Sequence, residues 1–405
     1  MGSSPPLRED RGIAKRLLVL GAGPAQTGLL RAAREAGLFV IACDRDPGAP
    51  GFAYADRRAV VSAEDETTLA HLAHAERVDG VIAPGIDWPV AIAARLAARL
   101  RLPHALDPET AALAVSKLRQ RERLAEAGVP QPAWHVTSGE ADGLPAPAVV
   151  KPADRQGQKG LTYVEEPSGL AGAVALAVAE SRSGIALVEE AVDGPELTVN
   201  AFSVAGTFYP LTVTDRLTAA PPAFGVALAH AWPSAHGAEE AAEVAGRAAE
   251  ALGVTDGPTY TQVRLGAEGP CVMELAARLG GGHDAELCHV ALGIDLNGLA
   301  LAAALGEPVE VPAAEPVGGA CVRFLVPPEG VLEAVEGLEE ARSAEGVVDA
   351  AVYRRPGWRF GPLRRGADRA GFVLARGDSR DDALERADRA AQRIRFLTTD
   401  AEALV

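Results

Sequence analysis

Over its first hundred residues the chain alternates short apolar runs with longer amphipathic segments rich in alanine. The apolar runs, typical of buried strands, lie at 16–20, 39–44 and 80–84, and the amphipathic segments, typical of helices, lie at 27–36 and 89–100. Strands that alternate with helices in this way form a parallel sheet with helices on both faces. The pattern therefore predicts an α/β fold that begins with a doubly wound, Rossmann-like domain at 15–112.

Strands dominate the next part of the chain. After a helical segment at 116–127, strands are predicted at 148–151, 161–164, 186–190, 196–205, 207–213 and 259–265, and a further strand carries Glu274. A last unit at 310–405 contains predicted strands at 319–326 and 371–375 and a terminal helix at 380–396. Residues 1–14 are polar and are expected to be disordered.

Composition narrows the class of protein. The 405 residues suffice for two or three domains, and the net charge of −16 without a basic run argues against a nucleic-acid partner. No apolar segment reaches the ~18 residues of a membrane span, and the N-terminus has no signal-peptide pattern, so we expect a cytoplasmic protein with no membrane partner. The four cysteines are far apart and are expected to be buried free thiols. They are Cys43, Cys271, Cys288 and Cys321.

The most informative segment is residues 272–284, which read Val-Met-Glu-Leu-Ala-Ala-Arg-Leu-Gly-Gly-Gly-His-Asp. It combines a strand that carries one carboxylate, Glu274, with an arginine four residues later, Arg278, and a triple-glycine loop that opens a helix. An acid, a guanidinium and a closely approachable backbone at one strand end suit a metal-bound polyphosphate.

Two lysines upstream have the character of phosphate ligands. Lys117 lies at the start of a helix, and Lys151 closes an apolar strand, where a buried ammonium needs an anionic partner. The polar hairpin at 153–160, with Gly157 and Gly160, follows Lys151 and could close over phosphates. Taken alone, the hairpin is better explained as an ordinary turn.

Further polar positions can be interpreted in the same way. Strand-end carboxylates at Glu189 and Glu190, with the open backbone to Val192, could bind adenine, and Glu196 could accept hydrogen bonds from ribose. Gln262, on the strand before Glu274, could give a metal a neutral oxygen. Each has an ordinary structural explanation, and for the carboxylates a solvated strand end is the better one when they are taken alone.

A Gly-x-Gly pattern at Gly21 and Gly23 stands between the first strand and helix. A dinucleotide fingerprint requires Gly or Ala three positions after Gly23, where this chain has Gln26, so a tight turn without a bound dinucleotide is the better explanation. An NAD-dependent oxidoreductase is accordingly the least favoured class, because it leaves 117–290 without a role.

The order and spacing of these motifs, from Lys117 to Arg278-Leu-Gly-Gly-Gly, resemble the ATP-grasp superfamily over nearly the whole chain. The chain is most similar to the L-amino-acid ligase branch, the bacilysin-type dipeptide synthetases. The resemblance implies an ATP-grasp fold with a Rossmann-like N-terminal domain, a central two-part ATP-binding domain at 113–309 with a lid subdomain at about 145–192, and a small α+β C-terminal domain at 310–405.

The resemblance also implies roles for the matching positions. In the nucleotide site, Lys117 and Lys151 would hold phosphates, Gly157 and Gly160 would shape the flap, Glu189, Glu190 and Val192 would form the adenine hinge, and Glu196 would bind ribose. At the reacting end, Glu274 would carry Mg²⁺ with Gln262, Arg278, Lys151 and Arg323 would act on the transferred phosphoryl group or the acyl-phosphate, and His283, Gly281 and Asp87 would lie beside the substrates.

Two positions depart from the pattern of many members. Ala276 stands where an asparagine often binds a second metal, and Gln262 stands where a glutamate or aspartate is common. Both departures predict a weaker second Mg²⁺ site.

The implied activity is ATP-dependent, ADP-forming ligation of a small carboxylate to an amine through an acyl-phosphate, on amino acids or related compounds, with ATP and Mg²⁺ as cofactors. The alternatives are a carboxyphosphate-using carboxylase of the biotin carboxylase or purine-biosynthesis type, and a nucleotide-binding protein with little turnover. Small-molecule substrates are the expected partners, and a homodimer is the expected assembly, because dimers are the most common oligomers.

Overall fold

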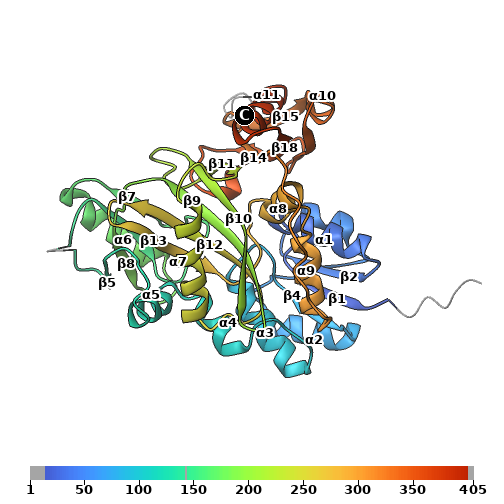
Figure 1. The fold of residues 1–405 in the computed structure, drawn as a ribbon, viewed down its shortest axis with the longest axis horizontal. Helices are drawn as coiled ribbons and strands as arrows, with labels where there is room; N and C mark the ends of the chain where they lie inside the picture. Colours follow the sequence, from blue (N-terminus) through green and yellow to red (C-terminus); the bar gives the residue numbers. More distant parts are fainter. Residues whose placement is uncertain (1–13, 142–143, 400–405) are drawn as a thin grey trace, which may run out of the picture.

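The computed structural model describes residues 14–141 and 144–399 (Figure 1). The predicted disordered N-terminus lies outside this part of the chain except for Ala14. The mixed α/β class is confirmed: one parallel sheet, one large antiparallel sheet and two smaller antiparallel sheets pack with helices. In Figure 1 the parallel sheet lies on one side of the large sheet and the β5–β8 sheet on the other.

The N-terminal sheet has the strand order β3-β2-β1-β4, and all its strands are parallel. Its strands are β1 (Arg16–Leu20), β2 (Phe39–Asp44), β3 (Arg57–Val60) and β4 (Gly80–Ile82), and its helices are α1 (Thr27–Glu35), α2 (Glu66–Glu76) and α3 (Trp88–Leu100). Short 3-10 turns lie at Pro24–Gln26 and Pro50–Tyr54. Leu17 to Leu20 are fully buried, as expected for an apolar strand covered on both faces. The predicted β-α alternation is confirmed.

A second sheet, β5-β8-β6-β7, forms a separate layer with its own apolar core against one helix. Its elements are β5 (Trp134–Thr137), β6 (Ala148–Pro152), β7 (Thr162–Val164), a 3-10 turn (Pro167–Gly169), α6 (Leu170–Glu180) and β8 (Ala186–Glu190). Because β6 and β7 are antiparallel neighbours, the segment between them is the predicted hairpin.

The large antiparallel sheet has the order β13-β12-β9-β10-β11-β14-β18-β16. Its strands are β9 (Glu196–Val204), β10 (Thr207–Thr218), β11 (Ala227–Trp232), β12 (Gly257–Gly266), β13 (Gly269–Ala276), β14 (Gly319–Leu325), β16 (Val347–Val352) and β18 (Gly371–Gly377). The sheet runs without interruption across residue 310, since β11 pairs with β14. The division into domains at that residue stays a prediction.

The helices between these strands join the layers. They are α4 (Pro108–Ala114), α5 (Lys117–Glu126), α7 (Ala238–Ala251), α8 (Asp284–Leu292) and α9 (Leu296–Ala304). One apolar core unites α3, α4, α5 and α7 with strands of the parallel and the large sheet, so the two sheets are packed as one body. Three cysteines are buried free thiols as predicted, and Cys271 is partly exposed.

The C-terminal end corrects one prediction. The remaining elements are β15 (Gly330–Glu336), α10 (Leu338–Arg342), β17 (Arg359–Phe360), a 3-10 turn (Gly366–Asp368), α11 (Arg380–Ala391) and β19 (Arg395–Thr399). The predicted helix 380–396 ends at Ala391, because the β-branched and aromatic run at 395–399 pairs with β15 in a three-stranded sheet.

Within the described residues, no single helix is long and apolar enough to cross a membrane. Helices α8 and α9, which meet at an angle of 120°, satisfy the length and composition test only when they are taken as a bent pair.

Candidate functional site

A cavity of about 1060 Å³ lies where distant parts of the chain meet. Its walls are the loops after β1 and β4, the hairpin after β6, the ends of β8, β12 and β13, and the segment 353–369. Eleven lysine and arginine side chains line it, against five carboxylates. In a chain with a net charge of −16, this local positive excess favours an anionic ligand.

Most of the predicted site residues meet in this cavity. Those that line it are Asp87, Lys117, Lys151, Gly157, Glu189, Val192, Glu196, Gln262, Glu274, Arg278 and Gly281. Those that do not are Gly160, Glu190, His283 and Arg323. The structure thus unites positions that span nearly two hundred residues of sequence.

Lys117 and Glu274 form an ion pair on the cavity wall. Lys117 is the first residue of α5, and its Nζ lies 2.6 Å from Glu274 Oε1. Burial lowers the pKa of Lys117, but Glu274 and Asp87 outweigh it, so its pKa is raised. Burial raises the pKa of Glu274, but Lys117 and Lys151 outweigh it, so its pKa is well below its ordinary value. Both groups are therefore charged at neutral pH and suited to phosphate and metal, respectively.

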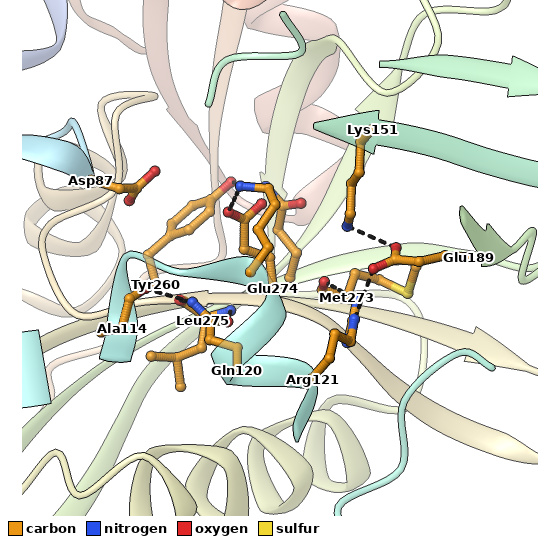
Figure 2. A network of polar contacts seen from close by, with 12 residues as sticks. Asp87, Ala114, Gln120, Arg121, Lys151, Glu189, Tyr260, Met273, Glu274 and Leu275 are labelled. Atoms are coloured by element: carbon orange, nitrogen blue, oxygen red, sulfur yellow. Dashed lines mark hydrogen bonds and ion pairs between the residues drawn. The ribbon is translucent and has the colours of Figure 1, made fainter. Parts of the chain in front are cut away.

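A second, fully buried group of charges holds Lys151. Figure 2 shows Lys151 and Arg121 reaching the carboxylate of Glu189, with Nζ–Oε2 and Nε–Oε1 distances of 2.7 and 2.8 Å. Burial raises the pKa of Glu189, but the two cations outweigh it and lower the pKa. For Lys151 burial prevails, and its pKa is lowered. The side chain of Glu189 is thus committed to this network.

Arg121 is a site residue that sequence reasoning missed. Its guanidinium also donates to the carbonyls of Val272 and Met273, at 2.9 and 2.5 Å, and so ties α5 to the strand that carries Glu274. The available signal was its place one helical turn after Lys117, which puts both side chains on one face of α5.

Gln262 and Glu274 are direct partners across β12 and β13, so their side chains leave the sheet on the same face. The amide of Gln262 donates to Tyr260 Oη at 3.4 Å and leaves its oxygen available. One carboxylate and one amide oxygen fit a Mg²⁺ ion that takes its other ligands from phosphates and water. No group of three acidic, histidine or cysteine ligands occurs among the described residues, and Ala276 offers no side-chain ligand. The weaker second Mg²⁺ site stays a prediction.

The hairpin after β6 spans the cavity. Residues 155–159 line the cavity wall. The side chain of Gln158, which has a φ of +62°, makes hydrogen bonds with two other segments of the wall. Its Nε2 donates to the Gly225 carbonyl at 3.0 Å, and its Oε1 accepts from the Gly366 amide at 3.1 Å. The hairpin therefore lies closed over the cavity, as a flap would.

At the other end of the cavity, Arg278 is fixed by Asp87. Its Nε lies 2.6 Å from Asp87 Oδ1, so this carboxylate orients the guanidinium and is not itself free for a substrate. The triple-glycine loop approaches the parallel sheet here. A Cβ on Gly281 would lie 2.9 Å from the Gly85 carbonyl, and glycine is therefore required at this contact.

Arg323 was wrongly predicted to lie in the cavity. Its Nε pairs with Asp388 Oδ1 of α11 at 3.0 Å, whereas its neighbours Val322 and Phe324 pack on the other face of β14. Because successive strand residues point to opposite faces, Arg323 must face α11.

Arg369 takes the place expected for Arg323. It lies over the Phe324 ring, with Cζ 3.7 Å from the centroid, lines the cavity, and has no carboxylate within ion-pair distance among the described residues. The segment 369–377 resembles the closing strand of ligases related to biotin carboxylase, but nothing in its residue types assigned Arg369 a role in the site.

Two residues predicted for the nucleotide end do not line the cavity. Glu190 follows Glu189 on β8 and so points away from the cavity, towards the amide of Ala133. Gly160 packs against Pro152 at the base of the hairpin, outside the cavity wall. His283 lies behind the wall, where it contacts Tyr353.

His230 also lines the cavity and is 2% exposed. Burial, reinforced by Arg216 and Arg369 and opposed by Asp284, lowers its pKa from 6.5 to about 4. Between these values the unfolded chain binds a proton that the native site excludes, so stability falls as the pH decreases through this range.

We expect about 3 kcal/mol of the wild-type free energy of unfolding to be lost between pH 6.5 and pH 4 through His230 alone. Urea denaturation across this range should show a shallower pH dependence for His230→Gln than for wild type. The control His289→Gln alters an exposed histidine on α8 and should keep the wild-type slope. Equal slopes for all three proteins would contradict the buried neutral imidazole.

Comparison with known proteins adds independent findings. The family model described as L-amino acid ligase C-terminal domain 2 matches residues 323–399. The crystal structure of an L-amino acid ligase from Bacillus licheniformis has a TM-score of 0.81, with 23% sequence identity, and the alignment covers 95% of this chain and 99% of that one. The two chains therefore share one fold.

Two relatives extend the comparison to sequence. A formate-dependent phosphoribosylglycinamide formyltransferase of Burkholderia lata is 30% identical over 413 residues, which cover 94% of this chain and 95% of the relative. The uncharacterized protein y4rH of Sinorhizobium fredii is 30% identical over 303 residues, covering 71% of this chain but only 62% of that protein. The chain thus spans less than two thirds of y4rH and nearly all of the formyltransferase.

Proposed function

Because this chain belongs to the ATP-grasp superfamily of ligases that form C–N bonds with ATP and Mg²⁺, we propose that it joins an amino acid, or a related small carboxylate, to an amine through an acyl-phosphate, with release of ADP. One observation carries the proposal. Lys117, Lys151, Glu274 and Arg278 converge in one cavity that continues past the glycine loop to Arg369. Phosphate ligands and an anion site therefore lie in one chamber.

In the first step the substrate carboxylate attacks the γ-phosphorus of ATP. Lys117, Lys151 and Arg278 stabilise the charge on the phosphoryl oxygens, and Arg369 binds and orients the carboxylate. Glu274 and Gln262 would hold Mg²⁺, which, when bound, would neutralise charge on the phosphates. In the second step an amine attacks the acyl-phosphate, phosphate leaves and an amide forms.

Other residues prepare the site. Glu189 and Arg121 fix Lys151, and Asp87 fixes Arg278, so both cations are positioned before ATP binds. The backbone from Glu189 to Val192 and the side chain of Glu196 supply the adenine and ribose contacts. The closed hairpin with Gly157 keeps water from the acyl-phosphate.

A screen for ADP and phosphate release against the amino acids, singly and in pairs, tests the proposal. We expect ADP and phosphate in equal amounts with at least one pair, and an amide product by mass spectrometry. AMP in place of ADP, or tight ATP binding with no nucleotide product for every acceptor, would overturn it; the second outcome identifies a nucleotide-binding protein with little turnover.

A second candidate has a specific observation in its favour. Arg45, Arg354 and Arg365 also line the substrate end of the cavity and suit an amine that carries its own phosphate. The 30% identity to a formate-dependent phosphoribosylglycinamide formyltransferase points the same way. Formate and bicarbonate arms in the same screen, with a phosphorylated amine as acceptor, distinguish a formyl- or carboxyphosphate route from amino-acid ligation.

Replacing Arg369 with methionine is expected to lower kcat/KM for the carboxylate about 10²-fold, since a charge-assisted hydrogen bond to the substrate is lost, while the KM for ATP stays close to that of wild type. Steady-state ADP release measures both constants. Arg376→Met serves as the control, because it changes an exposed arginine on β18, the strand that follows Arg369. An unchanged carboxylate KM and kcat in Arg369→Met would contradict the assigned role.

A further inference from the structure

A line of three polar side chains leads from the cavity wall into the protein interior. Tyr353, just after β16, lines the cavity. Its Oη lies 2.6 Å from His283 Nε2, and His283 Nδ1 lies 3.5 Å from Glu286 Oε2. This arrangement, which we call the Tyr353 relay, joins segments seventy residues apart and fits no part of the nucleotide site.

The protein holds the relay firmly. His283, 7% exposed, takes a left-handed conformation at φ +59° as the residue that caps α8, and its ring stacks on Phe372 with centroids 3.6 Å apart. Glu286 accepts a hydrogen bond from Asn297 at 2.8 Å, and Gly28 of α1 packs so closely on its carboxylate that a side chain there has no room. A non-glycine residue in a left-handed conformation is strained, and the surrounding contacts must compensate.

Charges fix the direction of the hydrogen bonds. Burial raises the pKa of Glu286, but its contacts with His283 and Asn297 outweigh burial and hold the pKa at about 2. The carboxylate can therefore only accept, and its charge favours the tautomer with the proton on His283 Nδ1, which lies 3.5 Å from Oε2. With this tautomer Nε2 accepts from the Tyr353 hydroxyl, and the Oη lone pairs remain as acceptors on a side chain that lines the cavity.

The second step of ligation needs such an acceptor. As the amine nitrogen bonds to the acyl carbon, it must lose a proton. Lys117, Lys151, Arg278 and Arg369 are cations, and the carboxylates of Asp87 and Glu274 are committed to ion pairs. Neither group is available to receive the proton, and among the described lining residues two neutral acceptors remain near the glycine loop, the His230 imidazole and the Tyr353 hydroxyl. The pKa of His230 is lowered to about 4, so its imidazole is a weak base, whereas Tyr353 can pass a proton on to His283.

We propose that Tyr353 is a catalytic residue that binds the attacking amine and takes its proton, with His283 and Glu286 as positioning residues behind it. The C–N bond forms, the C–O bond to phosphate breaks, and phosphate leaves with the electron pair. The amine proton passes to Oη while the hydroxyl proton moves to His283 Nε2, and the resulting imidazolium is balanced by Glu286. This inference rests on the proposed amide formation.

Other charged groups also face the relay. Arg369, Asp349 and Arg354 act on Tyr353 besides Glu286, and burial, the largest cause, raises the pKa of its hydroxyl strongly. A phenol whose pKa is raised does not ionise at neutral pH. It must therefore pass its own proton inward as it receives one, and this is why His283 is required.

The test compares two nucleophiles on the same acyl-phosphate. Hydroxylamine has a weakly basic nitrogen that loses its proton readily to water, whereas an amino-acid amine depends on a protein acceptor. In Tyr353→Phe we expect amide formation with an amino acid to fall about 10²-fold relative to hydroxamate formation. His283→Asn should shift the ratio in the same direction.

Matched variants control for non-specific effects. Tyr209→Phe alters a tyrosine that is 39% exposed on β10, and His289→Asn alters an exposed histidine on α8; neither should change the ratio. A loss of amide and hydroxamate in equal proportion in Tyr353→Phe would show a merely structural role and overturn the relay.

A spectroscopic measurement decides the relay separately from turnover. In ¹⁵N-histidine NMR of the wild-type protein we expect His283 as the Nδ1–H tautomer, with an Nε2 shift that changes in Tyr353→Phe. An Nε2–H tautomer, or an Nε2 signal unaffected by Tyr353→Phe, would refute the relay even if ligation is confirmed. Conversely, absence of any ADP in the substrate screen would refute the proposed function and, with it, the assigned amine.

Discussion

Replacing Arg121 with methionine is expected to lower the free energy of unfolding by about 3–5 kcal/mol, because the change removes one partner from a buried group of charges. The side chains of Arg121 and Glu189 are 3% and 1% exposed. The substitution leaves Glu189 with Lys151 alone and leaves the Val272 and Met273 carbonyls without their donor. Urea denaturation, extrapolated linearly to water, measures the loss.

Arg119→Met is the matched control for this prediction. Arg119 lies on the same helix, but its ion pair with Glu109 is exposed on both sides, at 42% and 80%. Exposed pairs contribute about 0–1 kcal/mol, so this variant should remain near wild type. If the two variants lose the same stability, the buried network does not hold α5 against β13, and the pre-positioning of Lys151 fails with it.

Replacing Glu274 with glutamine is expected to reduce the rate of ADP formation about 10³-fold at saturating ATP. The proposed Mg²⁺ ligand loses its charge, and several kcal/mol of charge stabilisation in the transition state are lost with it. Lys117 also loses its partner at 2.6 Å and becomes an uncompensated cation beside the phosphates. Activity measured across Mg²⁺ concentrations should show a higher requirement for the metal in this variant.

Two further variants sharpen this prediction. Glu268→Gln changes an exposed carboxylate in the turn between β12 and β13 and should behave as wild type. Gln262→Glu restores a second carboxylate opposite Glu274 and should lower the Mg²⁺ concentration required. Glu274→Gln with wild-type activity and wild-type Mg²⁺ dependence would contradict the assignment of the metal to this pair of strands.

The sequence predicted much of the fold because its elements are locally marked. Residue types alone place the apolar runs at β1 and β2, the helix α5, which starts at Lys117, and the loop of three glycines that precedes α8. Their composition restricts each segment to one backbone conformation. The prediction failed at 395–399, where the choice between helix and strand depended on pairing with β15, a contact invisible in local sequence.

The site residues divide in the same way, into those that local sequence marks and those that depend on tertiary contacts. Lys117, Lys151, Glu274 and Arg278 could be named from residue type, position within an element and order along the chain. Arg323 and Glu190 were misplaced because a strand presents alternate residues to opposite faces, so one position in the register decides whether a side chain meets the cavity or points away from it. The roles of Arg369 and Arg121 were missed because they depend on contacts with residues that are distant in the sequence.

The sequence by itself thus determined the class of fold, the order along the chain of the residues proposed to hold phosphate and metal, and the glycine loop that allows a close approach of the backbone. Only the tertiary structure decided which charges pair, which face the cavity and which lie behind it. Ion pairs such as Arg278 with Asp87, and the line from Tyr353 through His283 to Glu286, join residues 191, 70 and 3 positions apart. Their energies depend on distance and burial in three dimensions, and local sequence encodes neither quantity.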